Sequence, residues 1–350
     1  MATGARREKM GEVKSPGGKS QKQGRNAIMT KLHCISLPTP FPVGPVNVYL
    51  AKGEPLTLID TGPKTEATRA ALSQELARLG YNLPDLKQII LTHHHVDHLG
   101  LAGEIAAQSN AKIFAHPYNL PWLHDYASTR KHHAQFYRGF WKQNGVPQEL
   151  IERMLYLGEA LTQFRDSHLP VQPLPEGQEI HFAGCDWSVY HTPGHAGGLI
   201  CLWHAQSRTL ISNDHILKNI SSNPILEPPM SGEATRPQRL RDYLREMNRM
   251  AELNPQIAYT GHGQAVRNVR ELVARRVAFH HRRAEAILSA LGARTMSLWE
   301  LTQELFPALT NDADFFLAIS EVQGHLDLLQ NDQRIVETFH GEKVLWKRQA

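Results

Sequence analysis

Four histidines and an aspartate occupy residues 93–98 of this 350-residue chain, and no other stretch limits its possible folds and functions so strongly. The residues before this cluster turn apolar like a buried strand, and the residues after it have a helical pattern. Side chains two apart in an extended segment point to the same side, so His93 and His95 face one point. Where the helix begins the period changes, so Asp97 and His98 face a neighbouring point. Imidazoles and a carboxylate aimed at two adjacent points predict a pair of metal ions, with zinc as the expected metal.

The alternative interpretation is a surface histidine cluster or a tag-like accident of sequence. Its position argues against that interpretation, because the cluster lies at a strand-to-helix junction, where sites form in α/β proteins. We therefore take it as the centre of a functional site.

The length accommodates one large α/β domain with a small appendage. No apolar run is long enough to cross a bilayer, so we expect no membrane partner. The three cysteines, Cys34, Cys185 and Cys201, are odd in number and lack paired spacing. They indicate a reducing compartment and a cytoplasmic protein, and they argue against a disulfide framework or a cysteine-type zinc site.

The formal charge of +4 is unevenly distributed. Residues 1–31 carry eight basic and two acidic side chains, a net of +6, so the remainder has a net charge of −2. The composition predicts a disordered basic leader over residues 1–28, with Met29 as an alternative start. A slightly acidic folded body is expected to follow.

The first half of the chain predicts a β-β-α-β-α-β run from a hairpin at 47–60 to a strand at 112–116. Residues 118–170 form a helical insert rich in aromatic residues, with two interpretations: a lid over a pocket, or a helical layer with its own aromatic core. The pair His132 and His133 in this insert indicates an exposed helix face rather than a ligand set.

Strand patterns return after residue 179 and alternate with polar loops as far as Asn268, which completes a domain over 29–268. From residue 269 the pattern predicts a long helix, a short helix opened by a capping box at Ser297, a third helix and a closing hairpin. Three helices and a two-stranded wing predict a winged-helix-like domain over 269–350. That fold often binds DNA, but this segment has no conspicuous run of base-reading arginine or lysine, and fold alone does not fix function.

Three further candidate ligands stand far from the cluster. His195, Asp214 and His262 each follow an apolar strand and adjoin glycine or a polar turn. Each one alone could be an ordinary loop residue. The ordered set, with His-x-His-x-Asp-His first, is much more specific.

These residues resemble the motifs of the metallo-β-lactamase superfamily over roughly residues 31–268. The resemblance rests on residues 92–98 (THHHVDH), 192–195 (TPGH), Asp214 and 261–263 (GHG). It implies an α/β protein with an αβ/βα sandwich fold and a dinuclear metal site at one edge. By this resemblance one ion is held by His93, His95 and His195, the other by Asp97, His98 and His262, and Asp214 bridges both.

The resemblance also assigns Asp60 to a carboxylate that supports the ligands by hydrogen bonds rather than binding a metal. The family usually has glycine before the bridging aspartate, whereas this chain has Asn213, which predicts a local difference in loop geometry. The end of the chain resembles the glyoxalase-II-like branch, especially its lactamase-beta-like-2 group. The cysteine ligand of many secreted class B β-lactamases is absent, and the flavo-diiron motif has Glu where this chain has His95.

The resemblance implies a hydrolase that uses a metal-bound hydroxide, oriented by Asp97 as the catalytic residue. Two divalent ions are expected, zinc first, with iron or manganese as alternatives. The first expectation for the substrate is a small-molecule thioester or lactone, as for a hydroxyacylglutathione hydrolase. The alternative is a single-strand endoribonuclease with a nucleic-acid partner, and a third is a binding module without turnover. The oligomeric state stays open.

Overall fold

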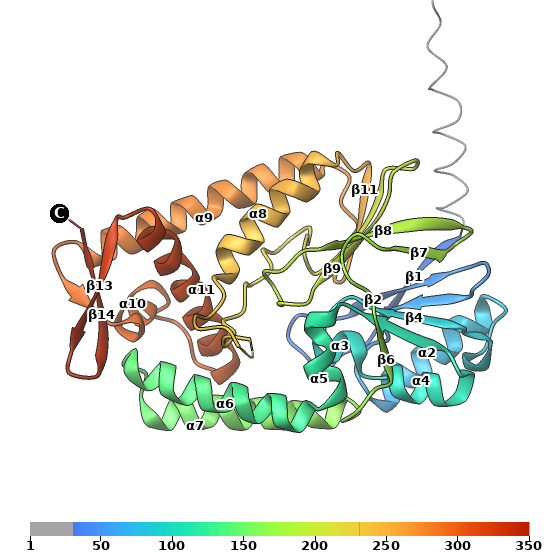
Figure 1. Ribbon diagram of the computed structural model, residues 1–350, viewed down its shortest axis with the longest axis horizontal. Helices are drawn as coiled ribbons and strands as arrows, with labels where there is room; N and C mark the ends of the chain where they lie inside the picture. Colours follow the sequence, from blue (N-terminus) through green and yellow to red (C-terminus); the bar gives the residue numbers. More distant parts are fainter. Residues whose placement is uncertain (1–30, 231, 350) are drawn as a thin grey trace, which may run out of the picture.

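The computed structural model describes residues 31–349 except residue 231, so the predicted leader over 1–28 lies outside the described residues. Two β-sheets lie face to face, and a separate group of helices with a small sheet follows them (Figure 1). No helix among the described residues is both long and apolar enough to cross a membrane.

The first sheet has six strands in chain order. They are β1 (Leu32–Leu37), β2 (Val46–Ala51), β3 (Thr57–Ile59), β4 (Gln88–Leu91), β5 (Lys112–Ala115) and β6 (Val171–Pro173). The neighbours from β1 to β3 pair antiparallel and those from β3 to β6 pair parallel. The connecting helices are α2 (Glu66–Arg78), η1 (Leu83–Asp85), α3 (Val96–Leu99) and α4 (Ala102–Ser109). The predicted β-β-α-β-α-β run is confirmed, whereas the three-residue strand β6 was missed.

The second sheet has the order β11-β10-β9-β8-β7. Its strands are β7 (Glu179–Phe182), β8 (Cys185–His191), β9 (Ile200–His204), β10 (Thr209–Asn213) and β11 (Ile257–Thr260). Helix α8 (Arg239–Glu252) connects β10 to β11, which pair parallel. A parallel pair needs such a crossover, because its strands run in the same direction.

Side-chain alternation along the strands explains the layers. In β4, Ile89 faces the core that contains Leu72 and Leu76 of α2, whereas Ile90 faces the core between the two sheets. The other face of the second sheet packs on α8 and on the long helix α9 (Val269–Leu291). The order helix, sheet, sheet, helix confirms the predicted αβ/βα sandwich.

After α9 the chain forms β12 (Thr295–Met296), α10 (Leu298–Leu305), α11 (Asp312–Asn331), β13 (Ile335–His340) and β14 (Lys343–Arg348). The predicted capping box at Ser297 is present, with its side chain accepting from the Glu300 amide at 3.2 Å. The predicted C-terminal hairpin is formed by β13 and β14. The two residues of β12 also pair with β14, which extends the hairpin to a three-stranded sheet, β12-β14-β13.

The insert contains η2 (Pro117–Asn119), α5 (Leu120–His124), α6 (Tyr126–Gln143), α7 (Gln148–Ala160) and η3 (Leu161–Phe164). The insert shares its apolar core with the C-terminal part of the chain, because Trp141 and Ile151 belong to one cluster with Ile287, Leu326 and Trp346. In Figure 1, α6 and α7 run from the sandwich toward this C-terminal group. The insert therefore connects the two parts of the chain.

Candidate metal centre

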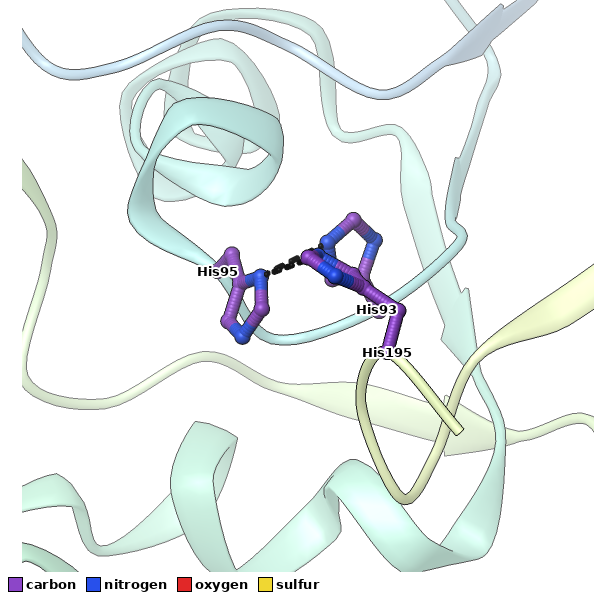
Figure 2. Close-up of side chains that lie close together, drawn as sticks. All are labelled: His93, His95 and His195. Carbon is purple, nitrogen blue, oxygen red and sulfur yellow. Dashed lines mark hydrogen bonds between the residues drawn. The ribbon is translucent and has the colours of Figure 1, made fainter. Parts of the chain in front are cut away.

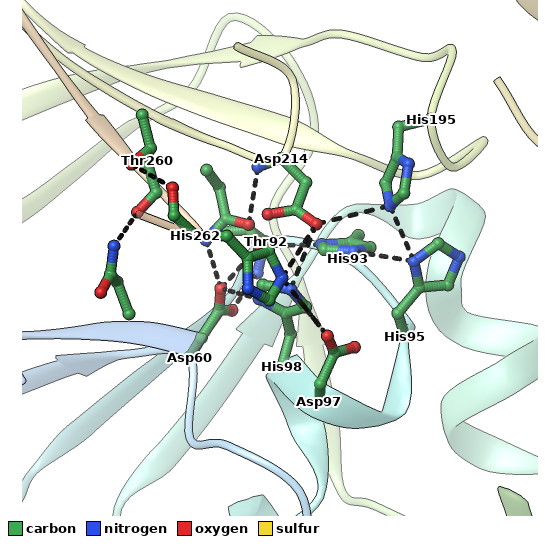
Figure 3. Close-up of polar contacts among 12 residues, drawn as sticks. Asp60, Thr92, His93, His95, Asp97, His98, His195, Asp214, Thr260 and His262 are labelled. Carbon is green, nitrogen blue, oxygen red and sulfur yellow. Dashed lines mark hydrogen bonds and ion pairs between the residues drawn. The ribbon is translucent and has the colours of Figure 1, made fainter. Parts of the chain in front are cut away.

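The polar cluster forms where the ends of several strands meet (Figure 3). The 93–98 segment follows β4, His195 lies between β8 and β9, Asp214 follows β10 and His262 follows β11. Backbone beyond the end of a strand has left the ladder, so its side chains are free to converge on one region. The seven predicted ligand positions are all brought together here.

Three histidine nitrogens form the first group (Figure 2). Nδ1 of His95 lies 3.1 Å from Nε2 of His93 and 2.9 Å from Nε2 of His195. Burial lowers the pKa of all three histidines from the ordinary value, so they are neutral near pH 7. Neutral imidazole is the form that binds a metal ion.

Asp97, His98 and His262 form the second group. Oδ2 of Asp97 lies 3.4 Å from Nε2 of His262 and 3.7 Å from Nε2 of His98. Burial raises the pKa of Asp97, but the charge of His98 and a hydrogen bond from His262 outweigh it and lower that pKa to about 2. Burial lowers the pKa of His262, but hydrogen bonds to Asp214 and Asp97 bring it to about 9. The negative charges of Asp97 and Asp214 therefore favour a positive charge between these side chains, carried either by a proton on His262 or by a metal ion.

Asp214 lies between the two groups. Its Oδ2 is 3.4 Å from Nε2 of His98, 3.5 Å from Nε2 of His262 and 3.6 Å from Nε2 of His195. Burial raises the pKa of Asp214, but the positive charge of His98 and hydrogen bonds from His262 and His98 outweigh burial. The pKa of Asp214 therefore lies well below its ordinary value, and this carboxylate stays ionised. A carboxylate in contact with both groups fits a bridging position.

The donor set fits divalent cations. Three overlapping sets of side chains each hold three ligand atoms within 4.8 Å of one another: His93, His95 and His195; His93, His98 and Asp214; and Asp97, His98 and His262. Among the described residues, Nε2 of His98 and Oδ1 of Asp214 are buried without a hydrogen-bond partner. Buried polar atoms are normally satisfied, and a metal ion would satisfy these.

The remaining ring nitrogens fix the direction of the imidazoles. Nδ1 of His262 donates to the Pro45 carbonyl at 2.8 Å, and Nδ1 of His195 donates to the Asn223 carbonyl at 3.0 Å. Both bonds leave Nε2 directed at the centre. These supporting groups were not predicted, since backbone carbonyls leave no signal in a sequence.

Asp60 is fully buried beside the centre. Its Oδ2 accepts from Nδ1 of His98 at 2.9 Å and from the Thr92 hydroxyl at 2.8 Å, and its Oδ1 accepts from the Thr92 amide at 2.8 Å. Asn213 donates to the same carboxylate at 2.5 Å and accepts from the Asp214 amide at 2.8 Å. Asn213 has a φ of 45°. Asparagine tolerates this left-handed conformation, so Asn213 fits a position where the family resemblance predicts glycine, and it also links two aspartates.

The Asp60→Asn variant is expected to bind zinc about 10- to 100-fold more weakly, the usual cost of losing a group that orients a ligand. The amide places a donor where the carboxylate accepts from His98, Thr92 and Asn213. Zinc titration against a competing chelator measures the change. An unchanged affinity would show that His98 is oriented without Asp60.

Two histidines of the insert lie outside the centre. His132 is exposed, as expected, but His133 is partly buried against Trp122, with ring centroids 4.4 Å apart. The prediction of an exposed face was wrong for His133, because α5 folds back over this side of α6. Neither histidine belongs to a ligand group among the described residues.

The αβ/βα sandwich and the His/Asp cluster at its edge define a class of metal-dependent hydrolase. The family model of the metallo-β-lactamase superfamily matches residues 41–262, and the chain belongs to this superfamily. It is 35% identical over 316 residues to the Probable metallo-hydrolase YqjP of Bacillus subtilis, covering 89% of this chain and 96% of that protein. It is 24% identical over 317 residues to the Beta-lactamase-like protein 2 homolog of Caenorhabditis elegans, covering 88% and 86%.

Among solved structures, a metallo-beta-lactamase family protein from Thermus thermophilus, TTHA1429, superposes with a TM-score of 0.78. Its sequence identity is 29%, and the match covers 91% of this chain and 99% of that one. The similarity therefore includes the C-terminal group of helices as well as the sandwich.

Proposed function

We propose that this protein is a dinuclear-metal hydrolase of a small-molecule thioester or lactone. The observation that carries the proposal is the position of Asp214, in contact with both groups of ligand atoms. One ion would be held by His93, His95 and His195, and a second by Asp97, His98 and His262. Zinc is the proposed metal, with iron or manganese as alternatives.

Two bound divalent cations would supply a water molecule acidified toward neutral pH and a positive field for the oxygen under attack. Asp97 is the proposed catalytic residue, because it is ionised and only partly covered, with a side-chain exposure of 14%. Its carboxylate can accept a hydrogen bond from the attacking water and orient it. Asp60 is fully buried, so its proposed role is to position His98.

A single-strand endoribonuclease is the second candidate. One support is the proposed place of the chain in the lactamase-beta-like-2 group, because the relative from Caenorhabditis elegans carries a matching name. The other support is the winged-helix-like order of elements after residue 269. Yet several arginines of this segment are paired with carboxylates rather than open to phosphate. Such pairs join Arg294 to Glu304, Arg334 to Glu285 and Arg283 to Glu321. The pairing favours the small-molecule substrate.

A substrate panel tests the choice. Metal-loaded protein is expected to hydrolyse a thioester or a lactone, and His195→Ala, assayed without excess zinc, is expected to lose that activity as the matched control. Labelled single-stranded RNA is offered at low and high salt, because binding through phosphates weakens steeply with salt. RNA cleavage with this salt dependence, and no thioester or lactone turnover, would reverse the order of the two candidates.

We also propose a cytoplasmic location. Cys34, Cys185 and Cys201 are all unpaired, and Cys34 is exposed. Free thiols persist in a reducing compartment, which supports the proposal. Fractionation with an antibody against the chain tests it.

A further inference from the structure

A line of aromatic rings leads away from the metal centre into the insert. It begins at His94, between the proposed ligands His93 and His95, with its ring 5.0 Å from that of His95. Trp122 of α5 stacks on His94, with centroids 4.8 Å apart and planes 5° from parallel. His133 of α6 follows, 4.4 Å from Trp122.

The same line reaches the C-terminal helix α11. Tyr137 lies 6.0 Å from His133 and 5.6 Å from Phe316 of α11. The Tyr137 hydroxyl donates to the Leu226 carbonyl at 2.6 Å, and its ring stacks on Trp141, with centroids 4.7 Å apart. Trp122, His133, Tyr137 and Phe316 are all only partly buried.

The next contacts return to the metal centre. Leu317 follows Phe316, and its carbonyl accepts from the Asn223 side chain at 2.9 Å. The Asn223 carbonyl in turn accepts from Nδ1 of His195 at 3.0 Å. Nε2 of His195 lies 2.9 Å from Nδ1 of His95, so the contacts form a closed circuit that starts and ends at this metal-ligand group.

Exposed apolar side chains lie along the return part of the circuit. Leu317 is 38% exposed, and Ile220, three residues before Asn223, is 50% exposed. The buried carboxylate of Glu227 is paired with Arg239 at 2.5 Å, so its charge is compensated. Partly exposed aromatic rings and open aliphatic side chains beside a reactive centre are typical of a binding surface for an apolar group.

We propose that the aromatic circuit, defined as His94, Trp122, His133, Tyr137, Phe316 and Leu317, binds the apolar acyl group of the substrate. The proposal rests on the hydrolase function above and narrows its substrate to esters of apolar acids. The reacting carbonyl lies at the metal centre, and the acyl group extends from the His95 and His195 side toward Leu317. The insert then acts in substrate recognition through α5 and α6.

The test compares two thioesters that differ only in the acyl group, acetyl and octanoyl. We expect the wild type to prefer the octanoyl thioester in kcat/KM. We expect Leu317→Asp and Trp122→Ala each to lower the octanoyl-to-acetyl ratio of kcat/KM about tenfold or more, the scale of discrimination in an apolar pocket. Tyr156→Ser is the matched control, since Tyr156 is 75% exposed on α7 and outside the circuit. Metal content is measured for every variant, so that loss of ions is separated from loss of recognition.

Calorimetric titration with octanoate and with acetate gives a readout that does not depend on turnover. Both anions carry the same carboxylate, so tighter binding of octanoate reports the acyl chain alone. We expect the wild type to bind octanoate more tightly and Leu317→Asp to lose that difference. If no thioester or lactone is hydrolysed but this difference is found, the proposed function fails and the apolar subsite stands. Equal binding of both anions by the wild type, or an equal fall in both kcat/KM values, would overturn the subsite and leave the circuit as packing.

Discussion

Replacing Asp97 with asparagine is expected to lower kcat by about 10²-fold or more, the scale of acid–base assistance by a single side chain. The amide keeps the size and one oxygen of Asp97 but removes the negative charge that faces His98 and His262. The variant is expected to keep its fold and at least one metal ion. Steady-state kinetics on the preferred substrate, with metal content and circular dichroism on the same samples, measure these outcomes.

His195→Ala separates ligation from turnover. Its proposed role is ligation only, so excess zinc is expected to restore part of its activity, whereas zinc should not restore Asp97→Asn. Near wild-type turnover by Asp97→Asn would contradict the role of Asp97 in orienting water. Asp60 and His215 would then be the next residues to test, and His215 is buried with both ring nitrogens lacking a hydrogen-bond partner among the described residues.

Gly261→Ala is expected to remove most of the activity, about 10²-fold, and to reduce metal content. A Cβ at this position would lie 1.9 Å from Oδ1 of Asp214 and 2.7 Å from Oδ1 of Asn213. The backbone cannot retreat freely, because the Gly261 carbonyl accepts from the Asn47 amide at 2.7 Å. Asp214 must therefore move, and displacing a catalytic group by about 1 Å can cost that factor in rate.

Gly158→Ala is the matched control for Gly261→Ala. Gly158 lies in α7, and a Cβ there would meet no atom within 4 Å. We expect this variant to keep wild-type activity and metal content. A Gly261→Ala protein with both metals and full rate would show that Asp214 tolerates displacement.

The elements that could be predicted from the sequence are those set by local patterns. Helix α9 begins directly after Asn268, and α10 begins at its capping box, because caps and apolar periods are local signals. Strands β6 and β12 were missed because they have only three and two residues and, unlike the three-residue β3, no hairpin turn before them. The core shared by the insert and the C-terminal helices is a long-range contact, which no local pattern encodes.

The metal-binding side chains of the candidate site could be predicted from the sequence, but the backbone groups that orient them could not. The metal-binding side chains form an ordered set of histidines and aspartates, and the structure brings that set together. The groups that orient them include the Pro45 and Asn223 carbonyls, and a carbonyl is present at every residue. Asn213 departs from the pattern that the family resemblance predicts, yet its side chain supplies hydrogen bonds that glycine lacks.

Metal content tests the central claim most directly. Protein purified without added chelator, or zinc-loaded after purification, is analysed for bound metal per chain, before and after dialysis against a strong chelator. The account predicts about two divalent ions per chain, loss of hydrolysis when they are removed, and recovery when zinc is returned. A value near zero that does not rise on adding zinc would contradict it, because the seven converging side chains would then hold no metal.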